Sequence, residues 1–285
     1  MKLISFQHGD GPVRVGVAVG EGVVDIAARL PGAPGDMVSL IKDWETWEPR
    51  VVEAVRTAAP DLRGDALTWL APVPRPGKIL AIGLNYADHI AESGMGTPED
   101  QLWFAKMPTA VTGPFSPVAL PRVSEKLDYE AELAVVIGRR CRHVRAEDAM
   151  SMVFGYCVAN DVSVRDWQLR TSQFTVGKSF DTHAPFGPWI VTADEIANVC
   201  NLDVRLFVNG EKRQDSSTSH LVFDIPAQIA HLSQAMTLEP GDVLLTGTPG
   251  GVGAACKPPR WLRAGDIVRV EIDQIGAIQN PIVGE

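Results

Sequence analysis

Cysteine is scarce in this 285-residue chain, and the four cysteines present stand far apart. None forms a CxxC pair, so the usual spacing of zinc sites and redox dithiols is missing. The strand-like residues around Cys157 predict a buried apolar side chain there. Reduced thiols are typical of the cytosol, so we expect a cytoplasmic protein. The cysteines are Cys141, Cys157, Cys200 and Cys256.

Long apolar runs and an excess of basic residues are also missing. No apolar run reaches the ~18 residues that a bilayer-spanning helix needs, and the first residues lack the apolar core of a signal peptide. Lysine and arginine number 26 against 35 aspartates and glutamates, which gives a formal net charge of −9. These features argue against nucleic acid and membranes as partners. They leave a small anionic substrate open, because such a ligand responds to local charge.

The order of predicted elements shows neither a regular alternation of strands and helices nor an internal repeat. Short apolar strands separated by Gly/Pro turns, in a chain that is 45% apolar, predict a strand-dominated α+β fold built on a mixed β-sandwich or barrel. Three prolines within five positions of segment 71–77 indicate a stiff connector. We therefore predict a small N-terminal α+β domain over residues 1–72 and a main domain over residues 73–285.

Local patterns predict the individual elements. Asn85 is the expected N-cap of a short helix, and the Gly- and Pro-rich residues that follow this helix are expected to form a long loop or lid. The predicted strands are 3–6, 13–26, 78–82, 132–137, 153–159, 187–192, 203–208, 243–246 and 267–272. The predicted helices are 37–44, 48–58, 86–93, 163–170 and 225–235, and the predicted lid is 94–118.

Two carboxylates stand one residue apart at the start of an apolar strand. Side chains alternate along a strand, so Glu130 and Glu132 point the same way and their like charges lie close together. Such a pair is unfavourable unless a cation or a shared proton relieves it. Oxygen-only ligands suit Mg²⁺, Mn²⁺ or Ca²⁺ better than zinc. The alternative is an edge strand with two solvated glutamates, because carboxylates are usually surface residues.

A third carboxylate follows the strand 153–159. Asp161 is either a further oxygen ligand or the N-cap of the helix 163–170, a role worth about 1 kcal/mol. Arg165 and Gln168 lie on one face of that helix and suit an anionic ligand. The alternative for Arg165 is a surface ion pair with Asp161.

Other residues are weaker candidates when taken alone. His89 and Glu92 stand at i and i+3, so the carboxylate could orient the imidazole as a general base, or the two could form an exposed helix pair. Lys178 could neutralise a developing oxyanion, or be a solvated lysine. Its surroundings lack the GxxxxGK[ST] spacing, so nucleotide binding is rejected. Thr248 lies in a Gly-rich turn that could approach a ligand.

Taken together, five ordered blocks resemble the fumarylacetoacetate hydrolase family. The resemblance covers about residues 74–285, and the first 70 residues resemble the smaller domain of many bacterial members. The blocks are Ile82-Gly83-Leu84-Asn85-Tyr86-Ala87-Asp88-His89, Asp128-Tyr129-Glu130-Ala131-Glu132-Leu133-Ala134-Val135-Val136-Ile137-Gly138, Ala159-Asn160-Asp161-Val162-Ser163-Val164-Arg165-Asp166-Trp167-Gln168, Gly177-Lys178-Ser179-Phe180-Asp181 and Leu245-Thr246-Gly247-Thr248-Pro249-Gly250-Gly251-Val252-Gly253.

The resemblance implies a mixed β-sandwich roll, usually a homodimer, with Mg²⁺ or Mn²⁺ in the site. By position, the implied metal ligands are Glu130, Glu132 and Asp161. The implied catalytic residues are His89 and Glu92, which activate water, and Lys178, which stabilises an enolate. The implied substrate-binding residues are Arg165, Gln168 and Thr248.

The strand before the histidine helix has no carboxylate, whereas the eponymous enzyme has an aspartate ligand there. The chain therefore resembles the three-carboxylate branch that acts on acylpyruvates and related 2-oxo acids. Leu84 replaces the arginine of several acylpyruvate-cleaving members, which leaves a substrate different from theirs open. The leading expectation is a metal-dependent hydrolase that cleaves a C–C bond in an acylpyruvate-like or sugar-derived 2,4-dioxo acid. The alternatives are an oxaloacetate decarboxylase, a 2-oxo acid tautomerase or hydratase, and, from another class, a non-catalytic metabolite-binding dimer.

Overall fold

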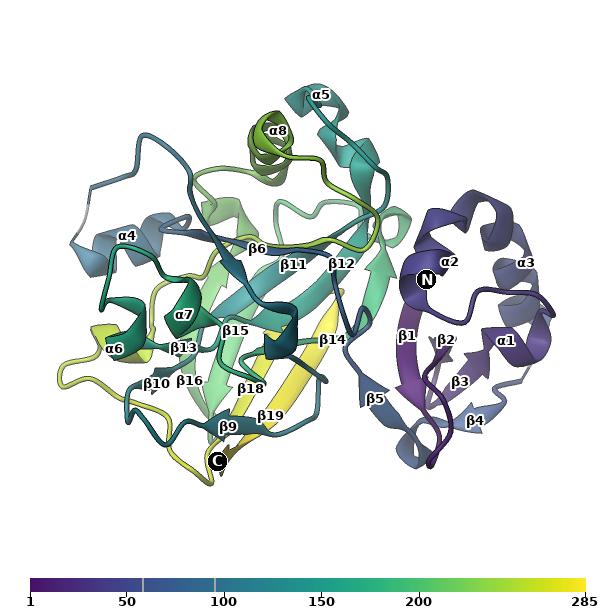
Figure 1. Ribbon diagram of the computed structural model, residues 1–285, viewed down its shortest axis with the longest axis horizontal. Coiled ribbons are helices and arrows are strands. Elements are labelled where there is room, and N and C mark those ends of the chain that lie inside the picture. The colour runs from purple at the N-terminus through teal and green to yellow at the C-terminus, as the bar shows by residue number, and fades with distance from the viewer. Residues whose placement is uncertain (58, 95) are drawn as a thin grey trace.

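Two packed sheets form the body of the protein in the computed structural model, which describes residues 1–57, 59–94 and 96–285 (Figure 1). The larger sheet has twelve strands and includes the path β4-β3-β2-β1-β14-β12-β11-β17-β6-β7. The smaller has five, in the order β16-β15-β18-β19-β9, and β10 and β13 form a separate pair. Parallel and antiparallel pairs both occur, so the prediction of a strand-dominated α+β fold with a mixed β-sandwich roll is confirmed.

The N-terminal unit, residues 1–72, holds three helices against one end of the large sheet (Figure 1). Its first strand pairs with β14 of the main part, so the sheet runs without a break through both parts of the chain. The division at residue 72 stays a prediction. The elements are β1 (Lys2–Gln7), β2 (Arg14–Val19), β3 (Gly22–Asp25), α1 (Ile26–Arg29), α2 (Met37–Lys42), α3 (Trp44–Thr57), β4 (Leu62–Arg63) and β5 (Thr68–Leu70).

Among its described residues, the main part contributes the remaining strands and five α-helices. The strands are β6 (Ile79–Gly83), β7 (Leu102–Lys106), β8 (Val111–Thr112), β9 (Val118–Leu120), β10 (Leu127–Asp128), β11 (Ala131–Ile137), β12 (Val153–Asn160), β13 (Ser163–Val164), β14 (Ala184–Thr192), β15 (Asp203–Val208), β16 (Glu211–Ser217), β17 (Val243–Leu245), β18 (Ile267–Ile272) and β19 (Gly276–Gly284). The helices are α4 (Ala87–Ser93), α5 (Ala146–Ala149), α6 (Arg165–Gln168), α7 (Thr175–Lys178) and α8 (Ile225–Ala235).

Strand β11 lies at the centre of the molecule and is buried along its whole length. Leu133 and Val135 pack into the core beneath the five-stranded sheet. Ala134 and Val136 pack into a second core that includes residues of α2 and α3. Because side chains alternate along the strand, Glu132 belongs to the same face as Ala134. The strand therefore carries a carboxylate into an apolar interior, where its charge needs a partner.

The prediction that residues 94–118 form an irregular loop or lid is wrong, because this segment contains strands. Residues 102–106 form β7, which pairs with β6 through partners that include Ile79↔Lys106 and Ala81↔Phe104. Residues 111–112 and 118–120 form β8 and β9, while part of segment 94–118, and the predicted helix end at Ala58, lie outside the described residues. Segment 94–118 is rich in Gly and Pro, so its composition predicts a loop although it contains the short apolar run of β7.

Two local predictions are corrected by hydrogen bonding. Asn85 does not cap α4, whose N-cap is Tyr86. Instead the buried Asn85 side chain donates to the carbonyls of Phe223 and Thr246 and accepts from Phe223 N. The predicted helix 163–170 shortens to α6, because Ser163 and Val164 pair with β10. Among the described residues, no helix combines the length and apolarity needed to cross a bilayer.

Candidate active site

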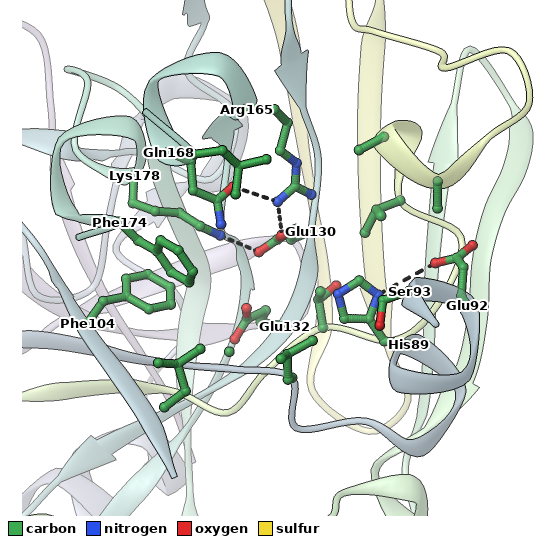
Figure 2. Close-up of a pocket in the computed structure, with 18 of the residues that line it drawn as sticks. His89, Glu92, Ser93, Phe104, Glu130, Glu132, Arg165, Gln168, Phe174 and Lys178 are labelled. Carbon is green, nitrogen blue, oxygen red and sulfur yellow. Dashed lines mark hydrogen bonds and ion pairs between the residues drawn. The ribbon is translucent and has the colours of Figure 1, made fainter. Parts of the chain in front are cut away.

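A cavity of about 790 Å³ opens beside the ends of β6 and β11 (Figure 2). Eight of the nine residues predicted for the site line it: His89, Glu92, Glu130, Glu132, Arg165, Gln168, Lys178 and Thr248. Asp161 is fully buried and contacts the lining through Lys178. Apolar side chains form much of the remaining wall, among them Leu84, Leu102, Phe104, Phe174 and Val252. The residues predicted from the sequence therefore gather at one cavity, eight in its wall and Asp161 directly behind Lys178.

Two neighbouring antiparallel strands bring the three carboxylates together. Glu130 and Glu132 flank the first residue of β11, and Asp161 follows the last residue of β12. The pairing of Ala131 with Asn160 sets the register, and Asp161 N donates to Glu130 O at 2.9 Å. One carboxylate oxygen from each of the three lies within 4.8 Å of the others.

Three buried cations surround this triad. Lys178, on α7, donates to Glu130 Oε2 at 2.6 Å (Figure 2). It also donates to Asp161 Oδ2 at 2.7 Å. Lys106, at the end of β7, donates to Asp161 Oδ1 at 2.5 Å. Arg165 Nη1 lies 2.6 Å from Glu130 Oε1. The alternative of a surface ion pair between Arg165 and Asp161 is wrong, because Lys106 and Lys178 occupy that aspartate and Arg165 is buried.

The two glutamates differ in their electrostatic surroundings. Burial alone would raise the pKa of Glu130, but Lys178 and Arg165 outweigh it and lower this pKa to about 2. Burial also raises the pKa of Glu132, and Asp161 and Glu130 raise it further. In the described part of the chain, the hydrogen-bond partner of Glu132 is the backbone N–H of Gly247, at 2.6 Å. Lys178 offsets part of the rise in the pKa of Glu132. Within the described residues, however, Glu132 has no ion pair of the kind that Glu130 and Asp161 make.

The donor set fits a hard divalent ion. Counting Asp128, which pairs with Arg165, four buried carboxylates face the three cations Lys106, Lys178 and Arg165. The three cations form ion pairs with Asp128, Glu130 and Asp161, so Glu132 is the carboxylate whose charge is left without a paired cation among the described residues. An ion bound by oxygen atoms of Glu130, Glu132 and Asp161 would supply that charge, and carboxylates suit Mg²⁺ and Mn²⁺.

The histidine pair is close but not hydrogen-bonded. His89 Nδ1 lies 3.5 Å from Glu92 Oε2, and this buried nitrogen has no hydrogen-bond partner among the described residues. Both oxygens of Glu92 instead accept from Gly251 N, each at 3.0 Å. The adjacent Asp88 accepts from Ser216 Oγ at 2.6 Å. The predicted dyad is thus placed at the cavity with its internal hydrogen bond unmade, as is common before substrate binds.

The predicted substrate-binding residues form a chain of polar contacts. Arg165 Nη1 donates to Gln168 Oε1 at 2.9 Å, which leaves the Gln168 amide N–H groups for other acceptors (Figure 2). Thr248 Oγ1 accepts from Gln214 Nε2 at 2.9 Å. Their roles toward substrate stay predictions.

Reasoning from sequence missed Lys106, Asp128 and Gln214. The composition of segment 94–118 places Lys106 in an irregular lid, whereas the short apolar run before it is typical of a strand that ends at this lysine. Asp128 stands in the same acidic block as the two glutamates and was not assigned a role. Gln214 lies in β16, an edge strand whose polar residues gave no strand signal.

Comparisons with known proteins agree with this geometry. The family model described as "Fumarylacetoacetate (FAA) hydrolase C-terminal" matches residues 78–283. A mitochondrial oxaloacetate tautomerase of Xenopus laevis is 43% identical over 99% of this chain and 90% of its own length. The human mitochondrial oxaloacetate tautomerase FAHD2A is 42% identical over 99% of this chain and 92% of its own length.

Solved structures show the same relationship. Maleylpyruvate hydrolase from Sphingobium sp. SYK-6, in complex with manganese(II) and pyruvate, is 37% identical with a TM-score of 0.85, over 100% of this chain and 99% of that chain. A fumarylacetoacetate hydrolase from Exiguobacterium antarcticum is 36% identical with a TM-score of 0.83, over 100% of both chains. This chain belongs to the fumarylacetoacetate hydrolase family.

Proposed function

We propose that this protein catalyses keto–enol tautomerisation of a small 2-oxo dicarboxylic acid of the oxaloacetate class. Glu130, Glu132 and Asp161 would hold Mg²⁺ or Mn²⁺ for this reaction. The observation that carries the proposal is the buried triad, in which Lys178 bridges Glu130 and Asp161. Glu130 and Glu132 line the same cavity as His89. The identity with oxaloacetate tautomerases supports this choice of substrate class. When bound, the ion would act as a Lewis acid that polarises the 2-oxo group and acidifies the neighbouring C–H bond.

The chain's own residues supply binding and proton transfer. Arg165 and Gln168 present N–H donors that suit a substrate carboxylate. Lys178 Nζ, a buried ammonium, would donate to the oxygen on which negative charge develops. In the keto-to-enol direction His89 Nε2, the ring nitrogen not turned to Glu92, would take a proton from the carbon next to the 2-oxo group, and the 2-oxo oxygen would gain a proton from the imidazolium or from water. The enol-to-keto direction reverses both transfers. Phe104 and Phe174 would exclude water from this space.

The hydrolytic cleavage predicted from the sequence is the second candidate. It is favoured by the 3.5 Å approach of His89 to Glu92 and by a cavity larger than a four-carbon acid fills. The maleylpyruvate hydrolase relative supports it as well. Against it, Glu92 is engaged by Gly251, so a water-activating pair needs a rearrangement that proton transfer by His89 alone does not.

Substitutions at His89 and at Glu92, taken together, separate these two reactions, because both mechanisms use His89 and only hydrolysis needs Glu92. His89→Gln should lower kcat for tautomerisation about 100-fold or more, because general acid–base groups contribute about 10²–10⁴-fold. Glu92→Gln should lower tautomerisation much less. The measurement follows decay of the enol absorbance of oxaloacetate, alongside release of pyruvate from acetylpyruvate.

His220→Gln is the matched control, since His220 contacts Ser216 and does not line the cavity. Equal and large losses in both reactions from Glu92→Gln would favour the hydrolase. Unchanged tautomerisation in His89→Gln would remove the histidine from the proposed mechanism.

A further inference from the structure

Residues 252–259, which follow the Gly-rich turn, form one wall of the cavity, and a backbone hydrogen bond joins the two ends of this segment. Arg260 N donates to Gly253 O at 2.9 Å, and Leu262 N donates to Leu127 O of β10 at 2.8 Å. We call residues 252–259 the wall loop. Its cavity-lining members are Val252, Ala254, Ala255, Cys256, Lys257 and Pro259. The wall loop therefore returns to β10, beside the acidic block.

Asp128 joins this loop to the substrate-binding arginine. It is fully buried at the end of β10 and does not itself line the cavity. Its Oδ1 accepts from Gly253 N at 2.8 Å, and its Oδ2 accepts from Ala254 N at 2.9 Å and from Arg165 Nε at 2.8 Å. One carboxylate thus fixes two successive backbone amides of the wall loop and one edge of a guanidinium.

One NH₂ group of the Arg165 guanidinium is left without a protein partner among the described residues. Nη1 is taken by Glu130 and Gln168. Nη2 is buried and has no hydrogen-bond partner among the described residues. Arg165 is 9% exposed and lines the cavity, so Nη2 is the donor left for a ligand. Because a guanidinium is planar, the contact of Nε with Asp128 sets the direction of Nη2.

Gly253 is needed for this close approach. A Cβ atom at this position would lie 2.6 Å from Asp128 Oδ1 and 2.2 Å from Arg260 O. Both distances are shorter than real contacts allow, so any side chain at residue 253 must push the wall loop away from Asp128. The hydrogen bond that ties the wall loop to β10 therefore needs both the carboxylate of Asp128 and the absence of a side chain at Gly253.

We propose that Asp128 is a positioning residue that holds Arg165 Nη2 and the wall loop in a fixed relation, and thereby sets affinity for a carboxylate of the 2-oxo acid. The inference rests on the proposed function for the identity of the substrate. It assigns Asp128 no part in metal binding, because its oxygens are occupied by Gly253, Ala254 and Arg165.

The test is Asp128→Asn. Both oxygens of Asp128 accept hydrogen bonds, but an asparagine has only one oxygen and one NH₂ group. In either orientation the NH₂ group faces an N–H donor, either that of Gly253 or those of Ala254 and Arg165, and at least one hydrogen bond is lost. We expect KM for oxaloacetate to rise roughly tenfold or more, with kcat changed less. Binding of oxalate to the Mn²⁺-loaded protein, measured by calorimetry, should weaken by a similar factor. Affinity for Mn²⁺ itself should stay within about twofold.

Two further variants make the test decisive. Asp166→Asn is the matched control. Asp166 is on α6, the same short helix as Arg165, but it accepts a hydrogen bond from Ser124 and does not line the cavity. Its KM and oxalate affinity should not change. Gly253→Ala should reproduce the Asp128→Asn result while keeping the carboxylate, and it decides the question alone if Asp128→Asn does not fold.

The outcomes separate this inference from the proposed function. Unchanged KM and oxalate affinity in folded Asp128→Asn or Gly253→Ala would overturn it, as would a loss confined to Mn²⁺ affinity. If the unsubstituted protein turns over neither oxaloacetate nor acetylpyruvate, the proposed function fails. Weakened oxalate binding in both variants would then still support the positioning role.

Discussion

Replacing Glu132 with glutamine should raise the dissociation constant for Mn²⁺ at least about 100-fold and abolish turnover. Glu132 is the member of the triad with no cation of its own, and an ion at the triad would be its principal partner. The same substitution should raise the thermal midpoint of the metal-free protein. A carboxyl whose pKa is raised on folding opposes folding at neutral pH, and glutamine removes that cost while keeping an acceptor for Gly247 N–H.

The matched control is Glu92→Gln, an equal change in the same cavity. Its carboxylate accepts from a backbone amide away from the triad, so Mn²⁺ affinity should be nearly unchanged. Calorimetric titration and thermal unfolding measure both effects. Tight Mn²⁺ binding by Glu132→Gln would remove this glutamate from the proposed ligand set.

Replacing Lys178 with methionine should lower kcat about 1000-fold, while Mn²⁺ affinity is kept or increased. The ammonium group lies 2.6 Å from Glu130 and 2.7 Å from Asp161, so it competes with an ion for the same oxygens. Its loss would free the triad for metal and remove the donor aimed at the developing negative charge, a contribution worth about 10²–10³-fold or more. Lys178→Arg should not restore activity, because a planar guanidinium does not fit a buried ammonium site.

Steady-state kinetics and metal titration of the same preparation separate these effects. Lys212→Met is the control, since that half-exposed lysine pairs with Asp215 on the surface. A kcat within tenfold of the unsubstituted protein, with metal bound, would show that Lys178 serves the charge balance alone.

The fold was predictable where local pattern and tertiary environment agree. Helix α8 matches its predicted range, because Asp224 accepts from Ala227 N as an N-cap and apolar residues recur at helical spacing. Strand β11 was equally clear from its apolar run. Two strands were missed for local reasons. Strand β16 forms a hairpin with its neighbour β15, but its residues are mostly polar and give no apolar alternation. Strand β7 is a short run inside a segment rich in Gly and Pro.

The site was predictable to the extent that its residues share short motifs. Glu130 and Glu132 follow from strand alternation, while their grouping with Asp161 depends on the resemblance and on the register of β11 with β12. No sequence pattern indicates that Lys106 reaches Asp161, because 55 residues separate the two. The Asp128 attachment was out of reach for the same reason, since Gly253 lies 125 residues further along the chain.

The most direct measurement is the rate of oxaloacetate tautomerisation by chelator-treated protein, before and after addition of Mg²⁺ or Mn²⁺, with acetylpyruvate assayed in parallel. The account predicts little activity without metal, recovery on addition of either ion, and faster turnover of oxaloacetate than of acetylpyruvate. Equal activity with and without metal, or no acceleration of either substrate by the metal-loaded protein, would contradict it.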